Sequence, residues 1–338
     1  MDSCHIDNYA LTNETEAASL HDLTVERATS MCTMGTCADG FTLAANKLLA
    51  SRQRLCGGLY SLKAFPHLLT VDLSSNRLTT LAGLEVLPNL ASLVASNNRI
   101  QHCLDFPAPD TIAGSRLRLA DLSNNSITSL QCPDAEGTKR GIHAHPQVET
   151  LRLDNNRFTS LAGFASLESL GTLSLSGNDI QNQADATIGG ILPAGLTELD
   201  LSHNRHLSEI PAALESLARL RTLALTGCGI ENVVLGHGVC ATSGIVFRGH
   251  DDVQPRVHQA YRWHVAKLLP HVFTLDGAAI TTKERAYAAT LTLVERGSVC
   301  GGRSDAGLED VAEEVLQRPR EIRRSQCSVD EYYATWDV

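Results

Sequence analysis

The sequence predicts an α/β solenoid, in which short coils stack so that each adds one strand to a parallel sheet. The string LSSNRLTTLAGL at residues 73–84 returns as LDNNRFTSLAGF at residues 153–164, with Leu, Asn, Arg, Leu, Ala and Gly at the same offsets. Of the 338 residues, 43% are hydrophobic but only 4% are aromatic, so aliphatic side chains must fill the core. A repeated aliphatic unit is typical of stacked coils.

The repeated unit follows the frame L-x-x-L-x-L-x-x-N-x-L, as in Leu68 to Leu78, and this frame resembles a leucine-rich repeat. The steps between successive asparagine positions are 22, 27, 31, 22, 26 and 24 residues. Seven coils are clear, and a degenerate eighth precedes them around residues 48–62, with Leu55 at the position of the last apolar residue. The asparagine positions of the seven clear coils are occupied by Asn76, Asn98, Asn125, Asn156, Asn178, Asn204 and Cys228.

Each part of the frame has a physical role. Alternate side chains of the L-x-x-L-x-L segment point inward from a strand. The asparagine amide both donates and accepts hydrogen bonds, so it can pair backbone groups of adjacent coils that would otherwise be buried alone. The following apolar positions form a return arm, which we expect to be a 3₁₀ helix or a brief helical turn. The polar segments 105–114 and 131–146 lengthen two steps, and we expect them to be surface loops.

Both ends of such a stack need a cap. Residues 11–50 predict helices over 23–34 and 40–53, so residues 1–44 form a helical arm in this interpretation. The repeat domain covers 45–300, and residues 301–338 add an amphipathic helix and an aromatic tail. Residues 261–277 resemble the cap of short leucine-rich repeat proteins, with the pattern Y-R-x-x-V followed by L-D-G. That resemblance implies a cap near 261–295, a helix over 261–268, Leu275 as the last strand position, and Thr281 or Thr282 as the N-cap of a helix from Lys283.

Composition and motif searches argue against several classes of function. The net charge of −10 and pI near 5.7 disfavour a bulk phosphate-binding surface. No secretory signal, membrane span or catalytic motif is visible, and the cysteines are expected to be free thiols. His143 and His145 have no Cys or carboxylate at ligand spacing. We therefore expect no catalytic, cofactor-binding or metal-binding residues, no direct nucleic-acid binding and no membrane binding.

The outward strand positions are the candidate partner-binding surface, which would be the concave face of a horseshoe. Hydroxyls dominate two positions before each asparagine position, and the row four positions before it carries three aspartates and one arginine. An elongated partner could lie there, although serine is also simply common at such positions. The candidates on this face are Asp72, Ser74, Asp121, Ser123, Arg152, Asp154, Asp200 and Ser202. The tail residues Tyr332, Tyr333 and Trp336 are a second candidate; they either dock a partner or fold back on the cap.

Residues 45–290 resemble the short, capped leucine-rich repeat proteins, which include regulators of protein phosphatase 1, a spliceosomal snRNP subunit and an axonemal dynein light chain. From Leu23, the arm and first repeat also resemble the radial spoke leucine-rich repeat proteins of cilia and flagella, although residues 181–256 and the tail depart from them. That resemblance implies a non-catalytic adaptor that binds radial spoke or other axonemal subunits, located in the cytoplasm and cytoskeleton, in the axoneme of a cilium or flagellum. The alternative is a regulatory or assembly subunit of the phosphatase, ribonucleoprotein or dynein light chain type.

Overall fold

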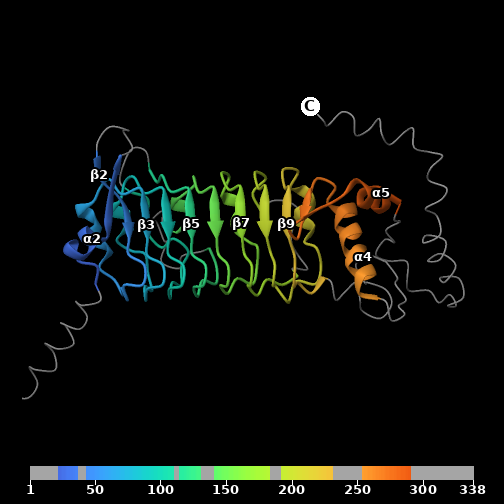
Figure 1. Ribbon diagram of the computed structural model, residues 1–338, viewed down its shortest axis with the longest axis horizontal. Coiled ribbons are helices and arrows are strands. Elements are labelled where there is room, and N and C mark those ends of the chain that lie inside the picture. Colours follow the sequence, from blue (N-terminus) through green and yellow to red (C-terminus); the bar gives the residue numbers. More distant parts are fainter. Residues whose placement is uncertain are drawn as a thin grey trace, which may run out of the picture. The chain divides into compact units, whose positions relative to one another are not determined.

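The computed structural model describes residues 22–36, 43–109, 114–130, 141–182, 192–230 and 253–290. Within them, one sheet holds eleven strands in chain order, from β1 to β11 (Figure 1). The strands are β1 (Cys32–Thr36), β2 (Leu43–Leu49), β3 (Thr70–Asp72), β4 (Ser92–Val94), β5 (Leu119–Asp121), β6 (Thr150–Arg152), β7 (Thr172–Ser174), β8 (Glu198–Asp200), β9 (Thr222–Ala224), β10 (Thr274–Leu275) and β11 (Ala278–Ala279).

The strands from β2 to β10 are parallel, and each pairs with the next. Antiparallel pairs close the two ends, β1 with β2 and β10 with β11. The seven clear repeats supply β3 to β9, and the degenerate coil around residues 48–62 supplies β2. The predicted solenoid with a parallel sheet is therefore confirmed.

The core is a column of aliphatic side chains, one set from each coil. The middle residue of each three-residue strand points inward, and Val71, Leu151 and Leu223 are each 0% exposed. Their neighbours on either side along the strand point outward, which gives each strand its buried centre. Since each coil buries its apolar face against the coils beside it, the stack is the unit that folds.

The predicted role of the asparagines is confirmed at atomic detail. Asn76 Nδ2 donates to the carbonyls of Ala50 and Leu73, both at 2.8 Å, and so joins two adjacent coils. Its Oδ1 accepts the backbone N–H groups of Gln53 at 2.9 Å and Leu55 at 3.0 Å. The amides of Asn98, Asn125, Asn156, Asn178 and Asn204 likewise bridge to the preceding coil.

The return arms contain 3₁₀ helices, as the short repeats predict. These are η1 (Leu59–Ala64), η2 (Leu84–Val86), η3 (Ile142–Ala144), η4 (Phe164–Ser166) and η5 (Ala212–Ser216). Gly83 and Gly163, the repeated glycines of the two similar strings, stand just before η2 and η4 with φ of 106° and 94°. Side chains other than hydrogen rarely accept this conformation, which explains why the glycine is repeated.

The two lengthened steps are only partly at the surface, so the prediction of two surface loops needs correction. His145 is 0% exposed and its ring packs against Phe106, with the ring centroids 4.5 Å apart. Its Nδ1 lies 2.6 Å from Ser115 Oγ and its Nε2 lies 3.2 Å from the Phe106 carbonyl oxygen. The polar composition concealed this contact, because His145 satisfies both of its ring nitrogens inside the core. Residues 110–113 and 131–140 of these steps lie outside the described residues.

The predicted helical arm is wrong for most of its described residues. Only α2 (Val25–Met31) is helical, capped by Thr24, whose Oγ1 accepts the Arg27 N–H at 3.3 Å. Residues 32–36 and 43–49, which the sequence places in helices, form the hairpin of β1 and β2. The edge of β3 offers backbone groups that a strand can pair and a helix cannot, so tertiary pairing overrides the helical preference of Leu, Ala and Lys.

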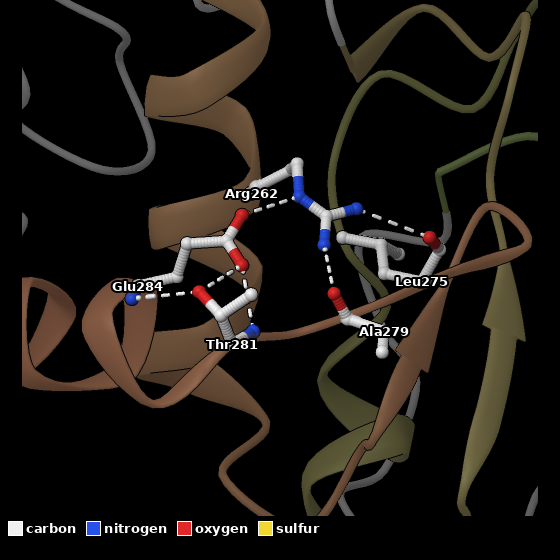
Figure 2. Close-up of polar contacts among 5 residues, drawn as sticks. All are labelled: Arg262, Leu275, Ala279, Thr281 and Glu284. Atoms are coloured by element: carbon white, nitrogen blue, oxygen red, sulfur yellow. Dashed lines mark hydrogen bonds and ion pairs between the residues drawn. The ribbon is translucent and has the colours of Figure 1, made fainter.

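At the other end, two helices and a hairpin follow β9. Helix α4 (Val253–Leu268) begins earlier than the sequence predicts, and α5 spans Thr282–Thr290. Figure 2 shows Arg262, whose Nε donates to Glu284 at 2.6 Å while its other nitrogens donate to the carbonyls of Leu275 and Ala279. Glu284 Oε2 accepts from the Thr281 N–H at 2.7 Å, and Thr281 Oγ1 accepts the Glu284 N–H, so the two form a capping box.

Candidate functional site

The strand register brings the predicted face residues into straight rows across the sheet. Asp72 pairs with Val94, which pairs with Asp121, which in turn pairs with Arg152. The same row continues through Ser174 to Asp200. Residues that lie 22 to 31 positions apart in the sequence are thus direct neighbours on what we call the outward face, the face of the sheet whose side chains do not enter the core.

The three aspartates of this row already accept hydrogen bonds from the backbone of their own coils. Asp72 Oδ1 accepts the Ser74 N–H at 2.9 Å, Asp121 Oδ1 the Ser123 N–H at 3.0 Å, and Asp200 Oδ1 the Ser202 N–H at 2.8 Å. Each carboxylate therefore shapes the bend that follows its own strand. Reversing these charges would disturb the fold as well as the surface, so other positions are better suited to test binding.

Asp154 and Arg152 behave differently from the other candidates. Asp154 Oδ1 accepts the Ser176 N–H at 2.9 Å and the Ser174 hydroxyl, and its Oδ2 lies 3.5 Å from Ser123 Oγ. It therefore joins three successive coils. Arg152 is exposed, and its guanidinium makes no hydrogen bond or ion pair with any described residue. Among the eight predicted face residues, Arg152 is the group best placed to meet a partner.

The serine candidates differ in accessibility. Ser74 is half-buried, whereas Ser123 and Ser202 are only 8% and 7% exposed. Buried hydroxyls contribute more to the coil than to a surface. The tail candidates Tyr332, Tyr333 and Trp336 lie outside the described residues.

A third row, which the sequence interpretation omitted, completes the outward face. It stands six positions before each asparagine and is also aligned by the strand register. Leu119 and Glu198 interrupt it, and its other members carry hydroxyls. The signal was present in the spacing, because the outward positions of a strand alternate with period two. The hydroxyl members are Thr70, Ser92, Thr150, Thr172 and Thr222.

The end of the outward face formed by β1 and β2 is apolar. Leu43, Leu49 and Met34 are 69%, 43% and 69% exposed. Leu49 pairs with Asp72 in the acidic row, and Leu43 lies on the same face of β2 because it is an even number of residues away. Met34 joins them through its pairing with Ala45. These residues were missed because the sequence placed them in a helix.

The described residues hold no cluster of three or more His, Cys, Asp or Glu side chains that could bind a metal ion. Both ring nitrogens of His145 are engaged in the core, and burial lowers its pKa to about 4 despite the hydrogen bond to Phe106. His143 is exposed, with its Nδ1 3.2 Å from Ser166 Oγ. Among the helices described, none has the length and apolar character needed to cross a membrane.

The repeat frame, the parallel sheet and the asparagine ladder define the class of fold: the chain has the leucine-rich repeat fold. A family model described as Leucine Rich Repeat matches residues 195–217. Two curated proteins show similar stretches. "Serine/threonine-protein kinase BRI1-like 1" of Arabidopsis thaliana is 32% identical over 139 residues, 40% of this chain and 11% of that protein. Human "Leucine-rich repeat-containing protein 23" is 33% identical over 131 residues, 38% of this chain and 34% of that protein.

The matched spans thus cover only a minor part of either relative. Among solved structures, the chain resembles one described as the Drosophila melanogaster SNF/U2A′ complex, with a TM-score of 0.35 and 21% identity over 57% of this chain and 87% of that one. It also resembles the APL1 leucine-rich repeat domain, with a TM-score of 0.40 and 18% identity over 54% of this chain and 50% of that one.

Proposed function

We propose that the protein is a non-catalytic scaffold that binds other proteins through the outward face of its sheet. The observation that carries this proposal is the alignment of two rows of mostly polar side chains, four and six positions before each asparagine position, across successive parallel strands. The asparagine ladder holds these strands in place, so a partner would meet a rigid surface and lose little entropy to ordering this protein.

As the particular role, we propose a structural adaptor subunit of the axonemal radial spoke in a motile cilium or flagellum. Support comes from the resemblance of the arm and first repeat to radial spoke leucine-rich repeat proteins. In this role the protein would bind other spoke or axonemal subunits, and it would be found in the axoneme.

A second candidate role is a regulatory or assembly subunit of the phosphatase, ribonucleoprotein or dynein light chain type. The observation that favours it is the cap, where Tyr261 and Leu275 are buried and Arg262 pairs with Glu284. The same Y-R and L-D-G pattern is shared with those short proteins. A phosphatase regulator would be soluble and would co-purify with the catalytic subunit.

Localisation separates the two roles. We expect the tagged protein to be confined to flagella or motile cilia and to stay with axonemes after detergent extraction. A diffuse cytosolic or nuclear signal, absent from the axoneme, would overturn the radial spoke proposal and favour the regulatory role.

The outward face itself is tested by blocking it with large side chains. Ser92→Trp with Thr150→Trp places two indoles in the row six positions before the asparagines, where a strand accepts aromatic residues. The matched control is Ser169→Trp with Ala218→Trp, two exposed positions outside the strands. We expect the first pair to reduce retention in axonemes and the second to leave it unchanged, with identical circular dichroism. Equal retention of both pairs would refute the use of this face.

A further inference from the structure

A row of arginines follows the bend at which the strands end. Each stands one residue after the asparagine position of its coil, or after Gln53 in the first coil, and all five are exposed. This position is separate from the outward face, so a binding role for these arginines goes beyond the proposed function. The arginine row consists of Arg54, Arg77, Arg99, Arg157 and Arg205.

The backbone fixes the spacing of this row. The N–H groups of Arg77 and Arg99 donate to Leu55 and Leu78, the residues that come after the preceding arginines, at 2.8 Å each. The N–H of Arg157 donates to Ile127 at 2.9 Å. Neighbouring coils are therefore one strand spacing apart, about 4.8 Å, and the six steps from Arg54 to Arg205 span about 29 Å.

The guanidinium groups of the row have no partners among the described residues. None of these five groups makes a hydrogen bond, an ion pair or a ring contact there. The contrast with other arginines is clear, since Arg118 pairs with Glu149 at 2.7 Å and Arg262 with Glu284 at 2.6 Å. The fold holds these five charges in line without neutralising them.

The flanks of the row are largely uncharged. Two positions after the row, four consecutive coils carry exposed uncharged residues, which are Thr79, Gln101, Thr128 and Thr159. Within the row, Ser126 takes one arginine position and Asp179 another, so the five cations meet one acid. In a chain with a net charge of −10, this strip is a local reversal of sign that attracts anions.

We propose that the arginine row binds an acidic, extended polypeptide segment of a partner protein. A span of about 29 Å corresponds to roughly nine residues of extended chain, with carboxylates meeting guanidinium groups along it. A nucleic acid fits less well. Single strands are held by aromatic side chains that stack on bases, whereas the large exposed aromatic residues of the described chain, Tyr60 and Phe273, lie outside the row.

The test uses the full-length protein and a fluorescein-labelled peptide of twelve glutamates, with binding followed by fluorescence anisotropy in low-salt buffer. The variant Arg77→Gln, Arg99→Gln, Arg157→Gln removes three charges from the row. The control Lys63→Gln, Arg219→Gln, Lys283→Gln removes three exposed charges that lie outside both the arginine row and the outward face, so both proteins have the same net charge. Thermal unfolding of both variants establishes that they fold like the wild type.

We expect the row variant to bind the peptide about tenfold more weakly, the combined effect of three exposed ion pairs, and the control to bind within about twofold of the wild type. Binding should also weaken at an ionic strength of about 0.15 M. Three results would overturn the proposal: no binding by the wild type, equal losses in both variants, or tighter binding of a twenty-nucleotide thymidine strand than of the peptide.

Discussion

At the scale of single residues, side chains that look alike in the sequence have different tasks. The asparagines join coils, as their spacing predicts, because one amide can satisfy several buried backbone groups. Asp72 and Asp121 were predicted to be recognition residues, yet each holds the backbone N–H two residues further on. The sequence could not separate these tasks, since an acid in an Asx turn and an acid facing a partner occupy the same position of the repeat.

Asn156 allows a direct test of the ladder. Its Nδ2 donates to the Leu122 and Leu153 carbonyls at 3.0 Å, and its Oδ1 accepts the Ile127 N–H at 3.0 Å. Asn156→Ala should lower the free energy of unfolding by about 2–4 kcal/mol, because several buried groups lose partners that are each worth about 1–3 kcal/mol. Urea denaturation measures this loss, and the exposed Thr159→Ala should change stability by less than about 0.5 kcal/mol. Equal effects would contradict the ladder's role.

His145 predicts a pH dependence of stability. Burial lowers its pKa in the folded protein from 6.5 to about 4. As the pH falls, the unfolded chain takes up the proton before the folded protein does. The contribution of neutral His145 to folding stability is therefore complete above pH 6.5 and is lost as the pH falls towards 4. Between neutral pH and the lower end of this window, the wild type should lose about 2–3 kcal/mol more than His145→Gln, at 1.36 kcal/mol per pKa unit.

Urea unfolding at several pH values measures that difference. The exposed His143→Gln is the matched control and should follow the wild type. Parallel loss of stability in the wild type and His145→Gln would show that another group is responsible.

At the scale of elements, the repeats were predictable and the ends less so. Residues 43–49 read as helix because Leu, Ala and Lys favour helices, and the reason they form β2 lies in another segment, the open edge of β3. The local sequence of residues 43–49 contains no information about the unpaired edge of β3, so it could not predict the strand. The return arms were predictable because a 22-residue step leaves room for only a brief turn between strands.

The strand at residues 43–49 can be tested with two adjacent leucines. Leu48 is 0% exposed and Leu49 is 43% exposed, as alternation in a strand requires. Leu48→Ala should cost about 2–5 kcal/mol of folding free energy, typical of a core leucine, and Leu49→Ala less than about 1 kcal/mol. Chemical denaturation of both variants gives the comparison, and similar losses would contradict the observed strand.

The cap depends on the contact between α4 and α5. Burial raises the pKa of Glu284, but the hydrogen bonds from Arg262 and Thr281 outweigh this and lower it to about 2. The contribution of the ionised Glu284 carboxylate to folding stability is therefore present above pH 4.5 and is lost as the pH falls towards 2. Glu284→Gln should cost about 2–4 kcal/mol at neutral pH, because it leaves the buried Arg262 unpaired and weakens the capping box.

The exposed Lys283→Gln, in the same helix, is the control for that measurement and should be nearly neutral in thermal unfolding. A neutral Glu284→Gln would show that the ion pair contributes little to the cap.

At the scale of the whole molecule, each strand that the structure describes forms its sheet hydrogen bonds only with its neighbours in chain order. Stability in such a stack is nearly a sum of coil and interface contributions. The sequence established this organisation through the frame alone, since every strand from β3 to β9 was placed by its asparagine position. The charge pattern along the bend was equally visible in the repeated asparagine–arginine pair, but its meaning required knowing that these arginines have no partners among the residues that the structure describes.

Local contacts make the spread of a defect predictable. In hydrogen-exchange mass spectrometry, Glu284→Gln should speed exchange in α5, β10 and β9, with little change in β3 to β5, because a defect at one end weakens only adjacent interfaces. A uniform increase along the chain would mean that the stack unfolds as one cooperative unit.

The strand register also has a consequence for how such a chain can grow. Steps of 22 to 31 residues all return to the same row of the sheet. Extra residues are therefore accommodated in the connections between strands, and the spacing and register of the strands stay fixed. Duplicating the 22 residues from 148 to 169 would therefore add one strand and lengthen the sheet by about 4.8 Å, without changing the register of the strands on either side. The protein is in this sense a ruler whose length can be edited in whole units.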